Sequence, residues 1–273
     1  MTTTRTKWHR EVRRPYRTTI RYTVSGPADG PTLALVHGWA CHRGDFDAVT
    51  DHLPETYRVL AIDLAEHGES RSARDAWTIA EFAHDVAAVL RAESVTSVVV
   101  AGHSLGGAVA VEAGRLLPGT VTQVIALDAL HYLGLFPAIG DEQARTLIRG
   151  FHDDFAAAVR GLVEGGSPEG TASELKDTYF HKMVAVRQPA GVQSIEGLIR
   201  WDMDAALRET TQPITVFAIR DLISQEAIDR YGDRLDLELI DLGSHHFPVE
   251  SPDATAKLLA GVITGQRVRD RRP

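Results

Sequence analysis

The sequence contains little of what disulfides, membrane spans and nucleic-acid surfaces are built from. Only one of its 273 residues is a cysteine, Cys41, so no disulfide can form within the chain and nothing requires an oxidising compartment. No run of about 18 apolar residues occurs, which excludes an ordinary transmembrane helix. The 29 basic and 37 acidic residues give a net charge of -8, which offers no attraction for phosphate backbones or anionic lipids. We expect neither nucleic acid nor membrane as a partner.

The remaining composition is that of a compact globular protein. Hydrophobic residues make up 44% of the chain and charged residues 24%, both near globular averages. The N-terminal residues carry positive charge, but no apolar stretch of signal-peptide length follows them. We therefore expect a cytoplasmic protein. Nothing in the sequence fixes its oligomeric state.

Short apolar runs alternate with segments of helical period, which is typical of parallel strands joined by crossover helices. The runs are almost continuously apolar, as expected for strands covered on both faces. We predict strands at residues 18–24, 32–37, 57–63, 97–101, 121–127, 214–219 and 235–242. Helices are predicted at 78–93, with Thr78 as N-cap, and at 104–117 and 253–264. The sequence thus predicts an α/β fold with a mostly parallel central sheet flanked by helices.

One long segment interrupts this alternation. From residue 130 to 211 the chain is polar and helical in character, with no linker long enough to separate two independent domains. We predict a core built from residues 1–128 and 212–273, with residues 129–211 inserted as a helical cap.

The most informative motif is Gly102-His103-Ser104-Leu105-Gly106, which joins a buried strand to a helix. This is G-x-S-x-G in the strand-turn-helix context that a nucleophilic serine requires. The sharp turn leaves no room for side chains at the two glycine positions, and it exposes the serine hydroxyl at the carboxyl end of the sheet. We predict that Ser104 is a catalytic nucleophile.

A serine hydroxyl needs a base to become a good nucleophile. His245 and His246 follow the strand predicted to end at Leu242, and Asp221 follows the strand at 214–219. A carboxylate at such a position would hold the imidazole in the correct tautomer. The order Ser104, Asp221, His245 is that of the α/β-hydrolases.

From about residue 16 to 262 the chain resembles an esterase-type serine hydrolase of the α/β-hydrolase superfamily. His37-Gly38-Trp39-Ala40 resembles the HG-x oxyanion loop, and the resemblance makes the backbone N–H groups of Trp39 and Leu105 the oxyanion donors. The run from Asp63 to Ser70 resembles D-x-x-G-H-G-x-S, except that Glu66 replaces a glycine. The resemblance also implies that the helical cap is inserted after the sixth strand of the fold.

Two assignments within the triad stay open. In related sequences an E-x-P pair follows the catalytic histidine by five and seven residues, and counting back from Glu250 and Pro252 favours His245 as the base, whereas the string HFP favours His246. For the acid, Asp221 has the commoner position, and Asp128 is the alternative because some members use the end of the strand at 121–127.

The expected activity is hydrolysis of a carboxylic ester, thioester or lactone of a small molecule through an acyl-enzyme on Ser104, with no metal and no cofactor. The alternatives are a cofactor-independent dioxygenase or a carbon-carbon hydrolase that uses the His-Asp pair on the same fold. Cys41 is expected to be a small buried filler or a substrate contact. Four aromatic residues are candidates for lining an acyl pocket: Tyr132, Phe136, Phe180 and Trp201.

Overall fold

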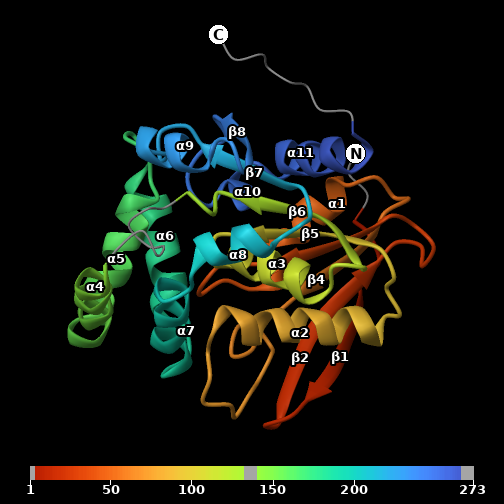
Figure 1. Ribbon diagram of the computed structural model, residues 1–273, viewed down its shortest axis with the longest axis horizontal. Coiled ribbons are helices and arrows are strands. Elements are labelled where there is room, and N and C mark those ends of the chain that lie inside the picture. Colours follow the sequence, from red (N-terminus) through yellow and green to blue (C-terminus); the bar gives the residue numbers. More distant parts are fainter. Residues whose placement is uncertain (1–3, 132–139, 266–273) are drawn as a thin grey trace.

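A computed structural model describes residues 4–131 and 140–265 of the chain. One eight-stranded sheet runs through these residues in the order β1-β2-β4-β3-β5-β6-β7-β8 (Figure 1). The two pairings made by β2 are antiparallel and all the others are parallel, which confirms the mostly parallel sheet. The strands are β1 (Trp8–Arg14), β2 (Thr18–Ser25), β3 (Thr32–Val36), β4 (Arg58–Ile62), β5 (Val98–His103), β6 (Val121–Leu127), β7 (Ile214–Ile219) and β8 (Asp236–Ile240).

The first strand is the one that the apolar pattern did not predict. All seven residues of β1 are exposed or half-buried, and it pairs only with β2 at the edge of the sheet. A solvated edge strand needs no apolar run, and charged side chains protect its free edge from pairing with other chains. Central strands such as β4, in contrast, are buried at every position and were predicted for that reason.

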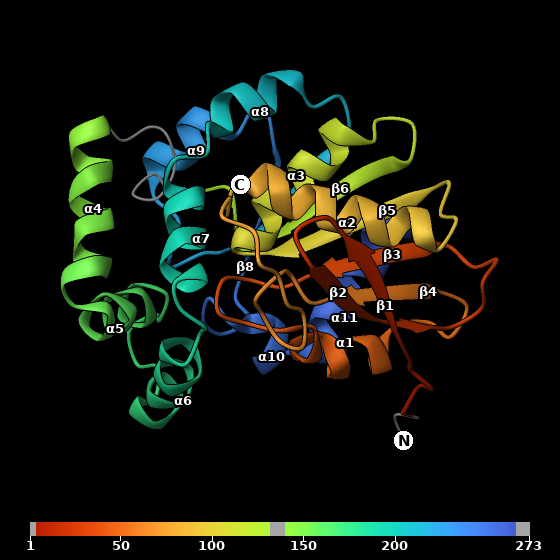
Figure 2. The ribbon, with the colours of Figure 1, turned by 90° about the horizontal axis from the view of Figure 1, so that it is seen from below.

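Helices cover both faces of the sheet. Figure 2 shows α2 and α3 on one face and α1 and α11 on the other. The helices outside the segment between β6 and β7 are η1 (Arg43–Phe46), α1 (Asp47–His52), α2 (Ile79–Ala92), α3 (Leu105–Leu116), α9 (Gln225–Tyr231), α10 (Phe247–Glu250) and α11 (Pro252–Thr264). The Thr78 hydroxyl accepts a hydrogen bond from the Glu81 N–H, as predicted for the N-cap of α2. No helix of the described residues is long and apolar enough to cross a bilayer.

Among the residues that the structure describes between β6 and β7, five helices occur, and we call them the inserted helices. They are α4 (Asp141–Asp153), α5 (Phe155–Gly165), α6 (Ser173–Val184), α7 (Ala190–Ile199) and α8 (Met203–Glu209). All five fall within the segment predicted as a cap. Helices α4 to α7 lie together at one end of the sheet in both views (Figures 1 and 2). The Lys182 ammonium fastens α6 to the core by pairing with the Asp45 carboxylate 2.5 Å away.

Two glycines allow β5, β3 and α3 to approach one another closely. A Cβ on Gly102 would lie 1.9 Å from the Gly106 carbonyl oxygen, and a Cβ on Gly106 would lie 2.3 Å from the Val36 carbonyl oxygen. Backbone atoms cannot move aside as a flexible side chain can. These contacts explain why the turn at Ser104 has glycine on both sides.

Gly106→Ala is expected to destabilise the fold by at least about 3 kcal/mol, because the new methyl group overpacks backbone. Gly150→Ala is the matched control. Gly150 lies inside α4, and a Cβ there meets nothing within 4 Å. That substitution should stabilise the protein by about 0.5–1 kcal/mol through helix propensity. Urea unfolding curves of the two variants and the parent chain measure both effects, and a Gly106→Ala midpoint equal to that of the parent would contradict the packing argument.

Candidate active site

Ser104 sits in the tight turn between β5 and α3. Its backbone has φ 53° and ψ -122°, a strained conformation for a residue other than glycine. The Ser104 N–H donates to the Leu127 carbonyl oxygen at 3.1 Å, and the Ser104 carbonyl oxygen accepts from the Gly107 N–H at 2.8 Å. The strand-turn-helix context predicted for the motif is therefore present, and the Ser104 side chain borders a pocket.

His245 and Asp128 form a hydrogen-bonded pair beside this turn. The Nδ1 atom of His245 donates to Asp128 Oδ2 over 2.6 Å, and Asp128 is fully buried. Asp128 Oδ1 also accepts from the Ile219 N–H at 2.8 Å and lies 3.3 Å from His131 Nε2. Burial by itself raises the pKa of Asp128, but the hydrogen bonds from His131 and His245 outweigh it and hold that pKa far below its ordinary value. Asp128 is thus a carboxylate that fixes the tautomer and orientation of the His245 ring.

The expectation that Asp221 orients the histidine is corrected by this geometry. Asp128 directly follows β6, which is the neighbour of β5 in the sheet, and its positive φ of 45° turns the chain at the strand end. Asp221 lies in a turn beyond β7, one strand further from Ser104, and its side chain is exposed. The sheet order therefore brings the alternative carboxylate, Asp128, to His245 and leaves Asp221 outside the site.

The loop that carries the histidines is held by Glu250. Its carboxylate accepts hydrogen bonds from the Ser244 N–H and from the Tyr179 hydroxyl, each at 2.8 Å, and it also binds the Ser244 hydroxyl. The fixed spacing of Glu250 after His245 thus serves to shape the loop. In this arrangement His245 takes the place beside Asp128, and His246 instead stacks on Tyr179 with ring centroids 3.8 Å apart.

The loop after β3 brings Trp39 to the same pocket. His37 shapes the loop because its Nδ1 donates to the Gly38 carbonyl oxygen at 2.7 Å and its Nε2 accepts from the Leu64 N–H at 3.0 Å. Burial lowers the pKa of His37 to about 4, so the ring is neutral at pH 7. The Trp39 indole N–H donates to the Gly191 carbonyl oxygen of α7 at 2.8 Å. The use of the Trp39 and Leu105 backbone N–H groups as oxyanion donors stays a prediction.

The unusual Glu66 has a structural role. It adopts φ 60°, in the left-handed region that a glycine would enter without strain. Its carboxylate accepts from the Ser72 N–H at 2.6 Å and from Arg187 Nε at 2.9 Å. The Arg187 guanidinium also donates to the carbonyl oxygens of Gly68 and Ser70. Glu66 therefore ties the turn after β4 to the segment that joins α6 and α7.

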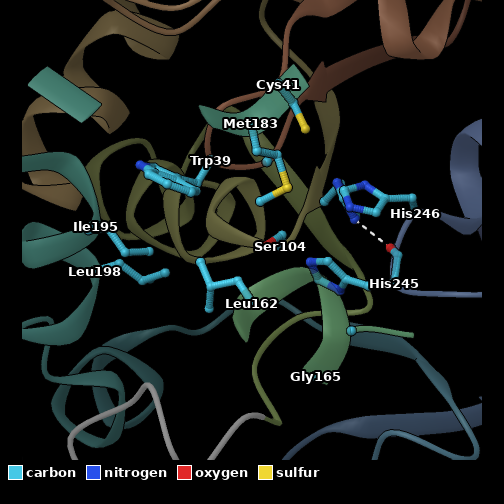
Figure 3. A pocket seen from close by; sticks show the side chains of 13 residues that line it. Trp39, Cys41, Ser104, Leu162, Gly165, Met183, Ile195, Leu198, His245 and His246 are labelled. Carbon is cyan, nitrogen blue, oxygen red and sulfur yellow. Dashed lines mark hydrogen bonds between the residues drawn. The ribbon is translucent and has the colours of Figure 1, made fainter. Parts of the chain in front are cut away.

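The pocket beside Ser104 has a volume of about 180 Å³ and is shared between the core and the inserted helices (Figure 3). Its apolar side chains are Trp39, Leu162, Met183, Ile195 and Leu198, and its polar ones are Cys41, His103, Ser104, His245 and His246. No Lys, Arg, Asp or Glu is among the described residues that line it. Burial raises the pKa of the Cys41 thiol to about 12, so Cys41 lines the pocket as a protonated, uncharged thiol.

Two of the aromatic residues considered for an acyl pocket, Phe180 and Trp201, are described, and they lie outside the pocket. The Trp201 indole N–H donates to Glu112 Oε1 at 2.7 Å, and Phe180 lies under the Arg160 guanidinium. Neither is among the lining residues, whereas Trp39, which the sequence analysis assigned only a backbone role, is one of them. Tyr132 and Phe136 are outside the described residues. In residues 4–131 and 140–265, no three His, Cys, Asp or Glu side chains form a group that could hold a metal ion.

Comparison with known proteins agrees with this geometry. The model of the family described as "Alpha/beta hydrolase family" matches residues 33–258, which is most of the chain. The chain belongs to the alpha/beta hydrolase family. It is accordingly an enzyme of the hydrolase class, with the fold that the elbow and the loop motifs indicated.

Several relatives of this hydrolase carry esterase or hydrolase names. The chain is 31% identical over 247 residues to a pimeloyl-[acyl-carrier protein] methyl ester esterase of Methylococcus capsulatus, covering 86% of this chain and 85% of the relative. It is 23% identical to a 2-(acetamidomethylene)succinate hydrolase of Mesorhizobium japonicum, covering 89% and 92% of the two chains. Among solved structures, an N-acyl homoserine lactone degrading enzyme shares the fold with a TM-score of 0.79 at 24% identity, covering 92% of this chain and 99% of the other.

Proposed function

We propose that this hydrolase cleaves a carboxylic ester, thioester or lactone of a small molecule through an acyl-enzyme on Ser104. The observation that carries the proposal is the 2.6 Å hydrogen bond between His245 and the buried Asp128, in a pocket that also exposes Ser104 on its strained turn. A nucleophile, a base and a carboxylate that orients the base are the groups that acyl transfer needs.

The chemistry begins when Ser104 Oγ attacks the acyl carbonyl carbon and its proton passes to His245 Nε2. Asp128 holds the Nδ1 proton and stabilises the imidazolium that forms. The backbone N–H groups of Trp39 and Leu105 would bind the oxyanion, and one such donor contributes on the order of 3 kcal/mol. His245 then gives its proton to the leaving group, and afterwards activates the water that releases the acid from Ser104.

The inserted helices supply the substrate-facing wall in this proposal. Leu162 of α5, Met183 of α6, and Ile195 and Leu198 of α7 all border the pocket. We infer that residues 129–211 act as the cap that selects the substrate. The methyl ester named for one relative and the lactone named for a structural neighbour both fall within the proposed substrate range.

Labelling with a fluorophosphonate tests the nucleophile directly, because an activated serine displaces fluoride from the reagent and becomes phosphonylated, whereas an ordinary serine hydroxyl does not react. We expect intact-protein mass spectrometry to find one adduct on the natural chain and none on Ser104→Ala, with the two proteins melting at similar temperatures. An adduct that persists in Ser104→Ala would place the reactive serine elsewhere. A folded natural chain that forms no adduct would exclude acyl-enzyme chemistry on Ser104 and favour base-only chemistry by His245 and Asp128.

A further inference from the structure

Three imidazole rings meet at the polar side of the pocket. The ring of His103 lies 4.7 Å from that of His245 and 5.8 Å from that of His246, and the His245 and His246 rings are 5.4 Å apart. All three side chains border the cavity beside Ser104. Figure 3 shows His245 and His246 on one side of the pocket, with Trp39, Ile195 and Leu198 on the opposite side. The pocket therefore has an apolar end and a polar end, and Ser104 lies close to the polar one.

Two of these rings already have defined hydrogen-bond partners. His245 Nδ1 binds Asp128, and His103 Nε2 donates to the His245 backbone carbonyl oxygen at 2.7 Å. Neither bond involves His246. The ring nitrogens of His246 have no hydrogen-bond partner among the residues that the structure describes, although this residue is only 5% exposed. The His246 ring is held by its stacking on Tyr179, which in turn is fixed by its bond to Glu250. A buried imidazole thus borders the cavity with its hydrogen-bonding capacity unused.

His103 and His246, at the polar end of the pocket, are uncharged, and this limits the charge that a ligand can carry. Burial lowers the pKa of His103 to about 3 and that of His246 well below its usual value, with the neighbouring imidazoles contributing. Both rings are neutral at pH 7, and no charged side chain stands among the described lining residues. A carboxylate entering this pocket would lose its hydration without gaining a cation. A neutral imidazole, in contrast, can donate a hydrogen bond to a hydroxyl or carbonyl oxygen and can accept one from a hydroxyl.

We propose that His246 is a specificity residue that binds a neutral hydroxyl or keto oxygen near the scissile carbonyl of the substrate. The inference rests on the proposed function, because it takes Ser104 and His245 to position that carbonyl. The reactive carbonyl must lie within about 3–3.5 Å of the serine. We take a substituent two carbons away to reach the His246 ring, whose centroid lies 5.4 Å from that of His245. The substrate class is an ester or lactone with an uncharged oxygen function on its acyl part.

The apolar end sets the size of the remaining group. An apolar cavity of about 150 Å³ binds benzene. The whole pocket has a volume of about 180 Å³, and Trp39, Ile195 and Leu198 lie at its apolar end (Figure 3). It accommodates a short alkyl chain or a single ring, and a long fatty acyl chain does not fit within it.

The test compares four 4-nitrophenyl esters that share a leaving group and a six-carbon acyl chain: the hexanoate, the two enantiomers of the 3-hydroxyhexanoate, and the adipate monoester. A neutral hydrogen bond corresponds to about 2- to 12-fold in kcat/KM. We expect one hydroxy enantiomer to be preferred over the plain ester by a factor in this range. The anionic adipate monoester should be the poorest substrate, by about 100-fold or more.

His246→Phe is the decisive variant because it keeps an aromatic ring against Tyr179 and removes both nitrogens. The ratio of kcat/KM for the preferred hydroxy ester to that for the plain ester should fall to about one. His246→Gln, which keeps a donor and an acceptor, should retain a preference and serves if the Phe variant fails to fold. The matched control is His152→Phe, an exposed position on α4, where the ratio should equal that of the natural chain.

A ratio that is the same in His246→Phe and in the natural chain would overturn the inference, as would a natural chain that does not prefer either hydroxy enantiomer. Efficient turnover of the adipate monoester would overturn the argument from charge. These failures are distinct from a failure of the proposed function. An enzyme that is labelled by fluorophosphonate at Ser104 but shows no such preference would leave the acyl-enzyme proposal standing.

Discussion

Asp128→Asn should lower kcat for a 4-nitrophenyl ester on the order of 10⁴-fold, whereas Asp221→Asn should leave it within about twofold. The amide of an asparagine at position 128 can donate a hydrogen bond to His245 Nδ1, which would select the wrong tautomer of the base. The bond from the Ile219 N–H can persist, because asparagine keeps a carbonyl oxygen for it. Asp221 is exposed and its side chain does not reach His245 in the structure.

Steady-state kinetics at pH 7.5 measure both effects, with melting temperatures as the check on folding. If Asp221→Asn lost several orders of magnitude in kcat and Asp128→Asn lost none, the acid that orients the base would be Asp221, at the more common position. Equal and large losses in both variants would mean that the loop after β7 contributes to the site in a way that the structure does not show.

His245→Ala is expected to reduce kcat by about 10⁵- to 10⁶-fold, because a serine hydroxyl without its base is a poor nucleophile. The cost of His246→Ala should be at least 100 times smaller, since it removes a wall contact and leaves the base in place. Added imidazole provides a second readout. It should restore part of the rate of His245→Ala by occupying the space that the missing ring leaves.

The same comparison tests the alternative base, His246, which the string HFP favours. If His246→Ala lost more activity than His245→Ala, the base would be His246, and the bond between His245 and Asp128 would be structural only. Rescue by imidazole in His246→Ala but not in His245→Ala would lead to the same conclusion.

The central fold could be predicted because its determinants are local. The buried strands β3 to β7 are apolar at nearly every position, and the Thr78 cap and the G-x-S-x-G motif are each recognisable within a few consecutive residues. The edge strand β1 was missed because it has no apolar run: all of its residues are exposed or half-buried, and Val12 is the apolar residue that packs against the core.

The site could be predicted only in part, because its assembly depends on strand order. Ser104 and His245 are marked by motifs that lie next to them in the sequence. The choice between Asp128 and Asp221 depends on which strand neighbours β5, and that is a property of the sheet. The role of Glu66 could not be predicted either, since its partner Arg187 lies 121 residues away, in the segment that joins α6 and α7.

The two ends of Trp39 belong to different parts of the enzyme. Its indole ring is fastened to the Gly191 carbonyl oxygen at the start of α7, and its backbone follows the loop after β3, beside the turn of Ser104. A shift of α7 that admits a larger substrate would therefore also displace Trp39, whose backbone N–H is expected to bind the oxyanion. Substitutions in α7 that change the substrate preference would thus change the rate of bond cleavage together with the affinity. Fewer substitutions in this helix can therefore alter specificity alone.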